Sequence, residues 1–137
     1  MELNNTTQYA IRILNYINSK EKHLLHSAKK IAEDLNINYK FLTAIMTKLA
    51  KEQFVKSIRG RDGGFQLMKE ANEIMIIDII YLFDSSFEKD ACILGIDKCN
   101  AKEKCFMHDK WVKPKMKIFE LFEGTTLEDV KGRGAKF

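Results

Sequence analysis

The chain has 137 residues, of which 45% are hydrophobic, and this is the length and composition of one globular domain with its own core. The N-terminal residues lack the basic start and apolar run of a signal peptide, and no apolar stretch approaches the roughly 20 residues that cross a bilayer, so a cytoplasmic protein is expected. The net charge of +4 is uneven, because residues 20–62 contain ten Lys or Arg residues and five acids, a pattern suited to nucleic acid.

The N-terminal part predicts an amphipathic helix. Apolar side chains recur at helical spacing over residues 7–19. Thr6 or Thr7 is the expected N-cap, because a threonine hydroxyl accepts hydrogen bonds from the free N–H groups of the first turn. The two histidines that follow, His23 and His26, are expected to be ordinary surface residues.

The next two helices are predicted to form a helix-turn-helix. Ser27 is a suitable cap for a helix over residues 28–35, and Asn36 tolerates the left-handed conformation of a tight turn. Asn38 is then a suitable cap for a third helix. The apolar face of that helix is Phe41, Leu42, Ile45, Met46 and Leu49. The alternative is an ordinary helical hairpin, since this turn more often contains glycine.

The opposite face of the third helix carries hydrogen-bonding groups and cations, which are the side chains that reach base edges and phosphates. These residues are Tyr39, Lys40, Thr43, Thr47 and Lys48.

A β-hairpin is predicted next. Apolar and polar side chains alternate over residues 55–59 and 65–68, and residues 60–64 between them are rich in glycine, which allows close approach to another backbone. Arg59 and Arg61 at the tip suit the narrow, electronegative minor groove of DNA, with simple solvation as the alternative. The hairpin completes a winged helix-turn-helix.

The C-terminal half predicts two further helices around a loop. The first spans residues 74–83, and the loop after it contains all three cysteines. The second runs from residue 106 to residue 122 and carries more apolar surface than one small domain would bury, with burial inside the chain as the alternative. Pro114 predicts either a kink or a regular helix that begins near Lys113.

The loop and the start of the last helix hold four candidate metal ligands, Cys92, Cys99, Cys105 and His108. A stable disulfide is not expected in a reducing compartment, and three cysteines leave one thiol over. The spacing differs from the C-x-x-C pairs of a zinc ribbon and suits a loop wrapped around a larger inorganic core.

Neighbouring residues are expected to support these ligands. Lys98, Lys102 and Lys104 lie among the thiols, where positive charge favours thiolate, with simple solvation as the alternative. The side chains expected to keep water from the site are Ile93, Leu94, Ile96 and Phe106.

The segment VKSIRGRDGGFQL, from Val55 to Leu67, resembles the wing of the IscR/NsrR family of bacterial transcription regulators. The start Thr7–Ala10, the end Thr126–Val130 and the positions of the cysteines are similar to that family as well, so the resemblance covers nearly the whole chain. It implies a mainly α fold with a small β-hairpin wing and a C-terminal dimerisation helix. It also implies a homodimer that binds a palindromic operator in double-stranded DNA, with an affinity that responds to an iron-sulfur cluster.

The resemblance assigns residues to these roles. The predicted DNA contacts are Ser27, Asn38, Tyr39, Lys40, Thr43, Thr47, Lys56, Arg59, Gly60 and Arg61. The predicted dimer contacts are Trp111, Met116, Phe119 and Phe122. The expected organisation is a DNA-binding part over residues 1–83, a cluster loop over 84–105, a dimerisation helix with a C-terminal turn over 106–130 and a flexible tail over 131–137.

The fourth ligand distinguishes two kinds of cluster. His108 matches the histidine ligand of IscR-like members, whereas NsrR-like members have an acidic ligand of a [4Fe-4S] cluster at the position of Gln8. A neutral amide is a poor ligand for iron, so [2Fe-2S] is favoured over [4Fe-4S], and a histidine ligand would raise its reduction potential.

Two alternatives remain from the sequence. One is a DNA-binding regulator that uses zinc or thiols without iron, and the other is an iron-sulfur electron carrier without a DNA function. An enzyme is not expected, because the chain has no nucleophile with a paired base, no phosphate-binding loop and no carboxylate pair. A small-molecule substrate and a membrane partner are not expected either.

Overall fold

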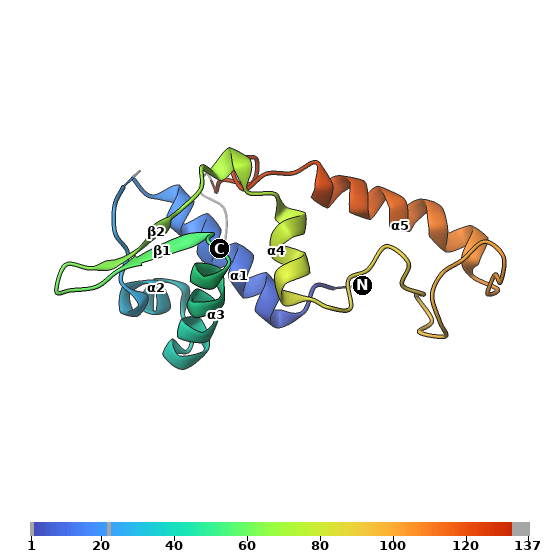
Figure 1. Ribbon diagram of the computed structural model, residues 1–137, viewed down its shortest axis with the longest axis horizontal. Coiled ribbons are helices and arrows are strands. Elements are labelled where there is room, and N and C mark those ends of the chain that lie inside the picture. Colours follow the sequence, from blue (N-terminus) through green and yellow to red (C-terminus); the bar gives the residue numbers. More distant parts are fainter. Residues whose placement is uncertain (1, 22, 133–137) are drawn as a thin grey trace.

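The computed structural model describes residues 2–21 and 23–132 and confirms the predicted fold class (Figure 1). The predicted tail lies outside these residues from position 133 onward. The helices are α1 (Asn5–Ser19), α2 (Ala28–Leu35), α3 (Tyr39–Lys51), α4 (Ile76–Phe83) and α5 (His108–Glu123). The strands β1 (Val55–Ile58) and β2 (Gly64–Leu67) form an antiparallel hairpin, and a 3₁₀ turn spans Ala71–Glu73. No helix within the described part is long and apolar enough to cross a membrane.

The DNA-binding part of the fold, called the reading head below, consists of α2, α3 and the β1–β2 hairpin. Helix α1 lies between this reading head and α4 (Figure 1). Its side chains Ala10, Ile13 and Leu14 are fully buried. Near its end, Tyr16 donates a hydrogen bond to the Asp34 carboxylate on α2, and burial together with this bond raises the pKa of Tyr16 to about 12.

The start of α1 differs from the prediction. Asn4, and not Thr6 or Thr7, caps the helix, because its side-chain oxygen accepts hydrogen bonds from the backbone N–H and the hydroxyl of Thr7, each at 2.8 Å. Thr7 is itself buried in the first turn. The helix therefore begins two residues earlier than its apolar periodicity indicates.

The caps predicted for the helix-turn-helix are confirmed. The Ser27 hydroxyl accepts from the N–H of Lys30 and the Asn38 side chain accepts from the N–H of Phe41, both at 3.1 Å. Asn36 adopts φ 52° and ψ 51°, the left-handed conformation that ends α2. The tight turn orients α3 so that Leu42, Ile45, Met46 and Leu49 are buried, with Phe41 partly buried at the edge.

Helix α4 begins at Ile76 and not at Ile74, because the C-terminal turn pairs with the residues before it. The N–H of Leu127 donates to the carbonyl of Ile74 at 2.8 Å, and Met75 forms an isolated β-bridge with Thr126. Leu127 is fully buried. The chain after α5 therefore returns to the body of the protein and holds Ile74 in an extended conformation.

Helix α5 begins at His108 and continues through Pro114, so the alternative start near Lys113 is wrong. The wing and the first turn of α5 lie at opposite ends of the long axis, and the loop after α4 runs toward that distant turn (Figure 1). Phe87 in this loop packs on Phe119 of α5, with ring centroids 4.7 Å apart.

Asp84 joins the end of α4 to the start of α1. Its buried carboxylate accepts hydrogen bonds from the N–H of Asn4 at 3.2 Å and from the hydroxyl and N–H of Ser86 at 2.6 and 3.2 Å. Burial raises the pKa of Asp84, but the hydrogen bonds from Ser86 and Asn4 outweigh it and bring this pKa below its ordinary value. The stabilisation by Asp84 is therefore present above the ordinary aspartate pKa and is lost as the pH falls through the lower folded-state pKa.

We predict that Asp84→Ala lowers the free energy of unfolding at pH 7 by about 1–3 kcal/mol, because two segments lose a charged acceptor. Urea unfolding followed by circular dichroism measures this difference, which should shrink in acid, where the wild-type carboxyl is also protonated. Asp62→Ala, at the exposed wing tip, is the control. A loss that stayed equal at all pH values would contradict the role assigned to the ionised carboxylate.

Candidate DNA-binding surface and cysteine site

One face of α3 presents polar groups at helical spacing. Tyr39, Thr43 and Thr47 are four residues apart, and the Tyr39 side chain is 57% exposed. The Thr43 and Thr47 hydroxyls donate to the carbonyls of Lys40 and Thr43, so their oxygens remain free to accept. The structure thus brings together these three residues and the exposed Lys40 as predicted, and their contact with DNA remains a prediction.

Lys48 does not belong to this face. Its ammonium lies over the ring of Phe83 on α4, 5.1 Å from the centroid. Ser27 and Asn38 accept the capping bonds described above with their side-chain oxygens, so the Ser27 hydroxyl proton and the Asn38 amide protons are the groups left for another acceptor.

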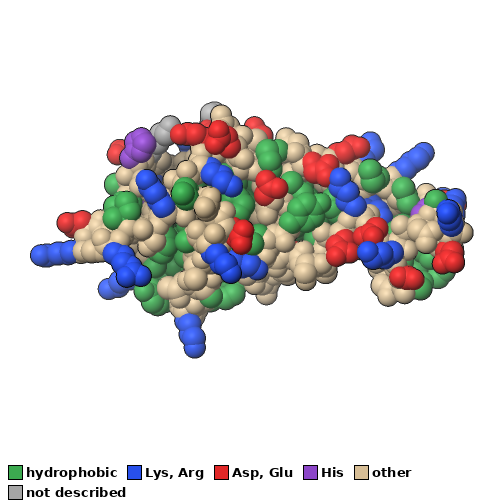
Figure 2. All heavy atoms as spheres, viewed as in Figure 1, with side chains coloured by type: hydrophobic (Ala, Val, Ile, Leu, Met, Phe, Trp, Pro, Cys, Tyr) green, Lys and Arg blue, Asp and Glu red, His purple; other side chains and the backbone are tan. Residues whose placement is uncertain are grey.

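The wing projects from the same end of the molecule. Arg59, Gly60 and Arg61 are exposed at its tip, and Gly60 adopts φ 122°. Figure 2 shows Lys and Arg side chains extending from this end into solvent, with fewer acids beside them. A convex, basic tip of this kind is attracted to the negative potential of a DNA groove.

The end of β2 nearest the wing tip is fixed by backbone contacts between Phe65 and His26. The N–H of His26 donates to the carbonyl of Phe65 at 2.9 Å, and the N–H of Phe65 donates back at 2.7 Å. A Cβ atom on Gly64 would lie 2.7 Å from the His26 carbonyl group, and Gly64 adopts φ 154°. Only glycine fits this close approach without displacing one of the two backbones.

The prediction that His26 is a surface residue is wrong. His26 is 5% exposed and its ring lies edge-on to that of Tyr16, with centroids 5.7 Å apart. Burial lowers the pKa of His26, and the nearby charge of Lys20 lowers it further. His26 is therefore a neutral packing residue, whereas His23 is exposed as expected.

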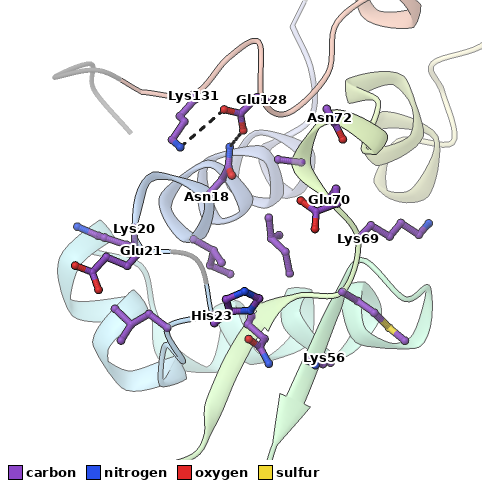
Figure 3. A pocket seen from close by; sticks show the side chains of 16 residues that line it. Asn18, Lys20, Glu21, His23, Lys56, Lys69, Glu70, Asn72, Glu128 and Lys131 are labelled. Atoms are coloured by element: carbon purple, nitrogen blue, oxygen red, sulfur yellow. Dashed lines mark hydrogen bonds and ion pairs between the residues drawn. The ribbon is translucent and has the colours of Figure 1, made fainter.

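A crevice of about 620 Å³ lies behind the wing (Figure 3). Lys56 lines it, so this predicted DNA contact faces the crevice as well as solvent. At its edge, the Glu128 carboxylate accepts a hydrogen bond from the Asn18 side-chain amide at 3.2 Å and lies 3.8 Å from the Lys131 ammonium. Charged side chains of both signs line the crevice, as is typical of a solvated surface. The bond between Asn18 and Glu128 joins the C-terminal turn to α1 across it.

The structure brings the predicted ligands near the start of α5 into neighbouring pairs, but it does not gather three of them at one point among the described residues. Cys99 Sγ lies 3.4 Å from Nδ1 of His108, which is buried at the first position of the helix. Cys105 lies close enough to Cys92 to contribute to a lowered pKa of the Cys92 thiol. Loop residues Ala91 and Lys98 form an antiparallel bridge that folds this segment back on itself.

Backbone N–H groups surround the Cys92 sulfur. The N–H groups of Ile96 and Leu94 donate to it and lower the pKa of Cys92 below its ordinary value, against the opposing effect of burial. Gly95 makes this wrapping possible, because it adopts φ 65° and its N–H donates to the carbonyl of Cys92 at 3.0 Å. The loop conformation therefore stabilises a thiolate.

The prediction that neighbouring lysines stabilise the thiolates is wrong for two of the three lysines. Lys98 pairs with Asp90 at 3.2 Å and Lys104 pairs with Asp109 at 2.9 Å, which neutralises both charges. Lys102 is exposed.

The predicted apolar cover is also absent from the described chain. Its four residues are exposed to solvent, namely Ile93 (48%), Leu94 (42%), Ile96 (65%) and Phe106 (85%).

The donor arrangement tests which inorganic group fits. Among the described residues, no three His, Cys, Asp or Glu side chains surround one metal position. Thiolates and an imidazole are donors that both iron-sulfur clusters and zinc use in proteins. One turn after His108, the indole N–H of Trp111 is buried and has no acceptor within the described chain.

The predicted dimer contacts on α5 differ in exposure. Met116 is 43% exposed, and Trp111 and Phe122 are partly exposed. Phe119 is 2% exposed and packs against Phe87, so it fills the core of its own chain and has little surface left for a partner. Leu121, which was not singled out as a dimer contact, is 61% exposed on the same helix.

The sequence matches the Rrf2 family, described as iron-dependent transcriptional regulators, over residues 3–133. A protein of Aquifex aeolicus named as an HTH-type transcriptional regulator is 36% identical, over 95% of this chain and 91% of that protein. NsrR of Oceanobacillus iheyensis is 33% identical over 95% of this chain and 89% of its own. IscR of Photorhabdus laumondii is 29% identical over 73% and 60% of the two chains.

The fold is similar to that of a solved regulator. The structure of CymR, the global cysteine regulator of B. subtilis, superposes with a TM-score of 0.80 at 24% identity and covers 96% of each chain. This likeness supports the winged-helix architecture described above.

We predict that Gly64→Ala destabilises the protein by about 1–3 kcal/mol, because the methyl group is strained at this φ and meets the His26 backbone. Thermal unfolding measures the loss. The same replacement at Gly124, where φ is −96°, should cost less. Equal effects at the two glycines would contradict the close approach of Gly64 to the His26 backbone.

Proposed function

This chain belongs to the Rrf2 family of transcriptional regulators, and we propose that it is a homodimeric repressor or activator whose operator binding is modulated by an iron-sulfur cluster. Like its relatives, which are transcriptional regulators, it is a DNA-binding regulator and not an enzyme. The observation that carries the proposal is that Cys99, in the loop between α4 and α5, lies 3.4 Å from His108 at the first position of α5, so that two donor types used by iron-sulfur clusters meet where the cysteine loop enters the helix. Such a regulator works on the chromosome in the cytoplasm.

The ligands in this proposal are Cys92, Cys99, Cys105 and His108. When bound, the cluster would supply a one-electron redox centre that is sensitive to iron supply and oxidants. A histidine as the fourth ligand favours [2Fe-2S] over [4Fe-4S]. Gln8 also favours it, since its side chain is an amide that donates to the carbonyl of Leu3 at 2.6 Å.

The residues of the chain offer a route from this site to the DNA-binding surface. The loop that carries the cysteines packs on α5 through Phe87 and leaves α4 at Asp84, which is hydrogen-bonded to Asn4 at the start of α1. On α1, the ring of Tyr9 lies 5.4 Å edge-on from Phe41 of α3. Ordering of the loop would therefore bias the position of the reading helix through a continuous chain of packed groups.

Dimerisation through α5 is part of the proposal. The exposed apolar side chains Met116 and Leu121 lie on a helix that projects from the body (Figure 1), which favours a second copy as the partner. Two copies related by a two-fold axis would present two recognition helices and two wings to a palindromic operator.

A second candidate is a thiol switch without iron. The lowered pKa of Cys92, to which the neighbouring Cys105 contributes, supports this candidate, because a thiolate is the reactive form of cysteine. The visible spectrum and the iron and sulfide content of anaerobically purified protein separate the two candidates, because only the cluster is coloured.

We predict that Arg59→Ala weakens binding of operator DNA by about 1–3 kcal/mol, because the wing loses a groove contact. Fluorescence anisotropy with a labelled fragment of the regulated promoter measures it. Lys117→Ala removes an equal charge from the exposed side of α5 and should leave affinity nearly unchanged. Equal losses in both variants would mean that only net charge matters and that the wing does not bind DNA.

We predict that Cys92→Ala and His108→Ala abolish or strongly weaken uptake of iron and sulfide under anaerobic reconstitution. Each removes one member of a donor pair, so one iron would be left under-coordinated. Operator affinity of reconstituted wild-type protein should then differ from that of both variants. Identical affinities would contradict the cluster-dependent switch even if the protein binds DNA.

A further inference from the structure

His26 joins the wing to the helical core through both its backbone and its side chain. Its N–H donates to the carbonyl of Phe65 on β2 at 2.9 Å, and its carbonyl accepts from the N–H of Phe65 at 2.7 Å. Its ring is buried and lies edge-on to the ring of Tyr16 on α1. One residue with a titratable side chain thus attaches β2 to α1.

One nitrogen of this buried ring has no partner. Nε2 of His26 is inaccessible to solvent and has no hydrogen-bond partner among the described residues. A protonated imidazole carries an N–H on both nitrogens, so the charged form would place a donor at Nε2 with nothing to accept its hydrogen. A buried charge with an unsatisfied donor costs free energy, and the neutral ring avoids the charge.

The groups on the neighbouring elements do not compensate a positive charge on the ring. On α1, the ammonium of Lys20 lies 4.9 Å from the centroid of the Tyr16 ring, and Tyr16 is a neutral phenol because burial raises its pKa to about 12. On α2, the Asp34 carboxylate accepts the hydroxyl of Tyr16 and pairs with Lys30 at 3.1 Å. Strand β2 contributes backbone groups. Burial, and then the charge of Lys20, lower the pKa of His26 accordingly.

We propose that His26 is a pH-sensitive switch for the wing: the neutral ring stays against Tyr16, and protonation draws it into water together with the backbone that holds Phe65. The wing would keep the hydrogen bonds within its hairpin and lose this attachment to the core. The effect on DNA binding rests on the proposed function, since a detached wing would present Arg59 and Arg61 in the binding geometry for a smaller fraction of the time.

The direction of the pH effect follows from where the proton binds. Above the ordinary histidine pKa of about 6.5, His26 is neutral in the attached and in the detached form, and attachment is strongest. Below it, the detached form binds the proton first, because the attached form has the lower pKa. The equilibrium then shifts toward detachment by at most about tenfold for each pH unit, until the pH falls below the pKa of the attached form.

Hydrogen exchange at the Phe65 amide measures this attachment, because the His26 carbonyl protects that N–H. Exchange is followed by NMR in DNA-free protein between pH 7.5 and 5.5, a range in which Asp84 stays ionised because its pKa lies below the ordinary value. After correction for the intrinsic pH dependence of exchange, protection of Phe65 should fall below pH 6.5, by up to about tenfold for each unit. Phe65 should also exchange faster than Leu14, which is fully buried in α1.

Two matched variants assign the effect to the buried ring. His26→Phe keeps an aromatic ring and the backbone bonds but cannot be protonated, so protection of Phe65 should no longer depend on pH. His23→Phe makes the same change at an exposed histidine and should behave like wild type. A further reading needs no variant, because the imidazole of His26 in the folded wild type should titrate below pH 6.5 in NMR spectra.

Operator binding connects the switch to function. Between pH 7.5 and 5.5, wild type and His23→Phe should lose more affinity for the operator than His26→Phe does. An equal loss in all three proteins would overturn the effect on DNA binding. If wild type binds no operator at pH 7.5, the proposed function fails, and exchange at Phe65 still tests the switch.

Three results in DNA-free protein would overturn the switch itself. The first is protection of Phe65 that does not change with pH or falls equally in His26→Phe. The second is equal protection of Phe65 and Leu14, since the wing would then detach only when the whole fold opens. The third is titration of His26 at or above the ordinary histidine pKa.

Discussion

The burial of α1 between the reading head and α4 is the constraint on which the other parts depend. Ala10, Ile13 and Leu14 have no exposed surface, so helices on both sides must pack against this one helix. Tyr16 anchors α2 through Asp34, while Asn4 anchors the end of α4 through Asp84. A shift of α1 would therefore change the positions of both the recognition helix α3 and the cysteine loop.

The same packing connects two distant parts of the molecule, the cysteine loop at the start of α5 and the reading head. The wing and the first turn of α5 lie at opposite ends of the molecule (Figure 1). Phe87, Asp84 and Asn4 form the described contacts between them, and each is a buried ring contact or a hydrogen bond with defined geometry. Loss of order in the loop would weaken the hold on α1 without requiring any part of the core to unfold.

The cysteine site also shows how a short loop controls reactivity. Nearby lysines are paired with aspartates, so the loop depends on backbone N–H groups to stabilise the Cys92 sulfur. These dipoles are fixed by the turn at Gly95 and are less sensitive to salt than mobile side chains.

The sequence by itself determined the features that depend on a few adjacent residues. The Ser27 and Asn38 caps, the Asn36 turn and the glycine-rich wing each follow from local backbone preference, and apolar periodicity located the core faces. The tertiary structure alone decided the burial of His26 and Phe119 and the contact of Cys99 with His108. These depend on contacts between segments that local patterns do not relate, because burial and pairing are set by whatever the folded chain brings alongside.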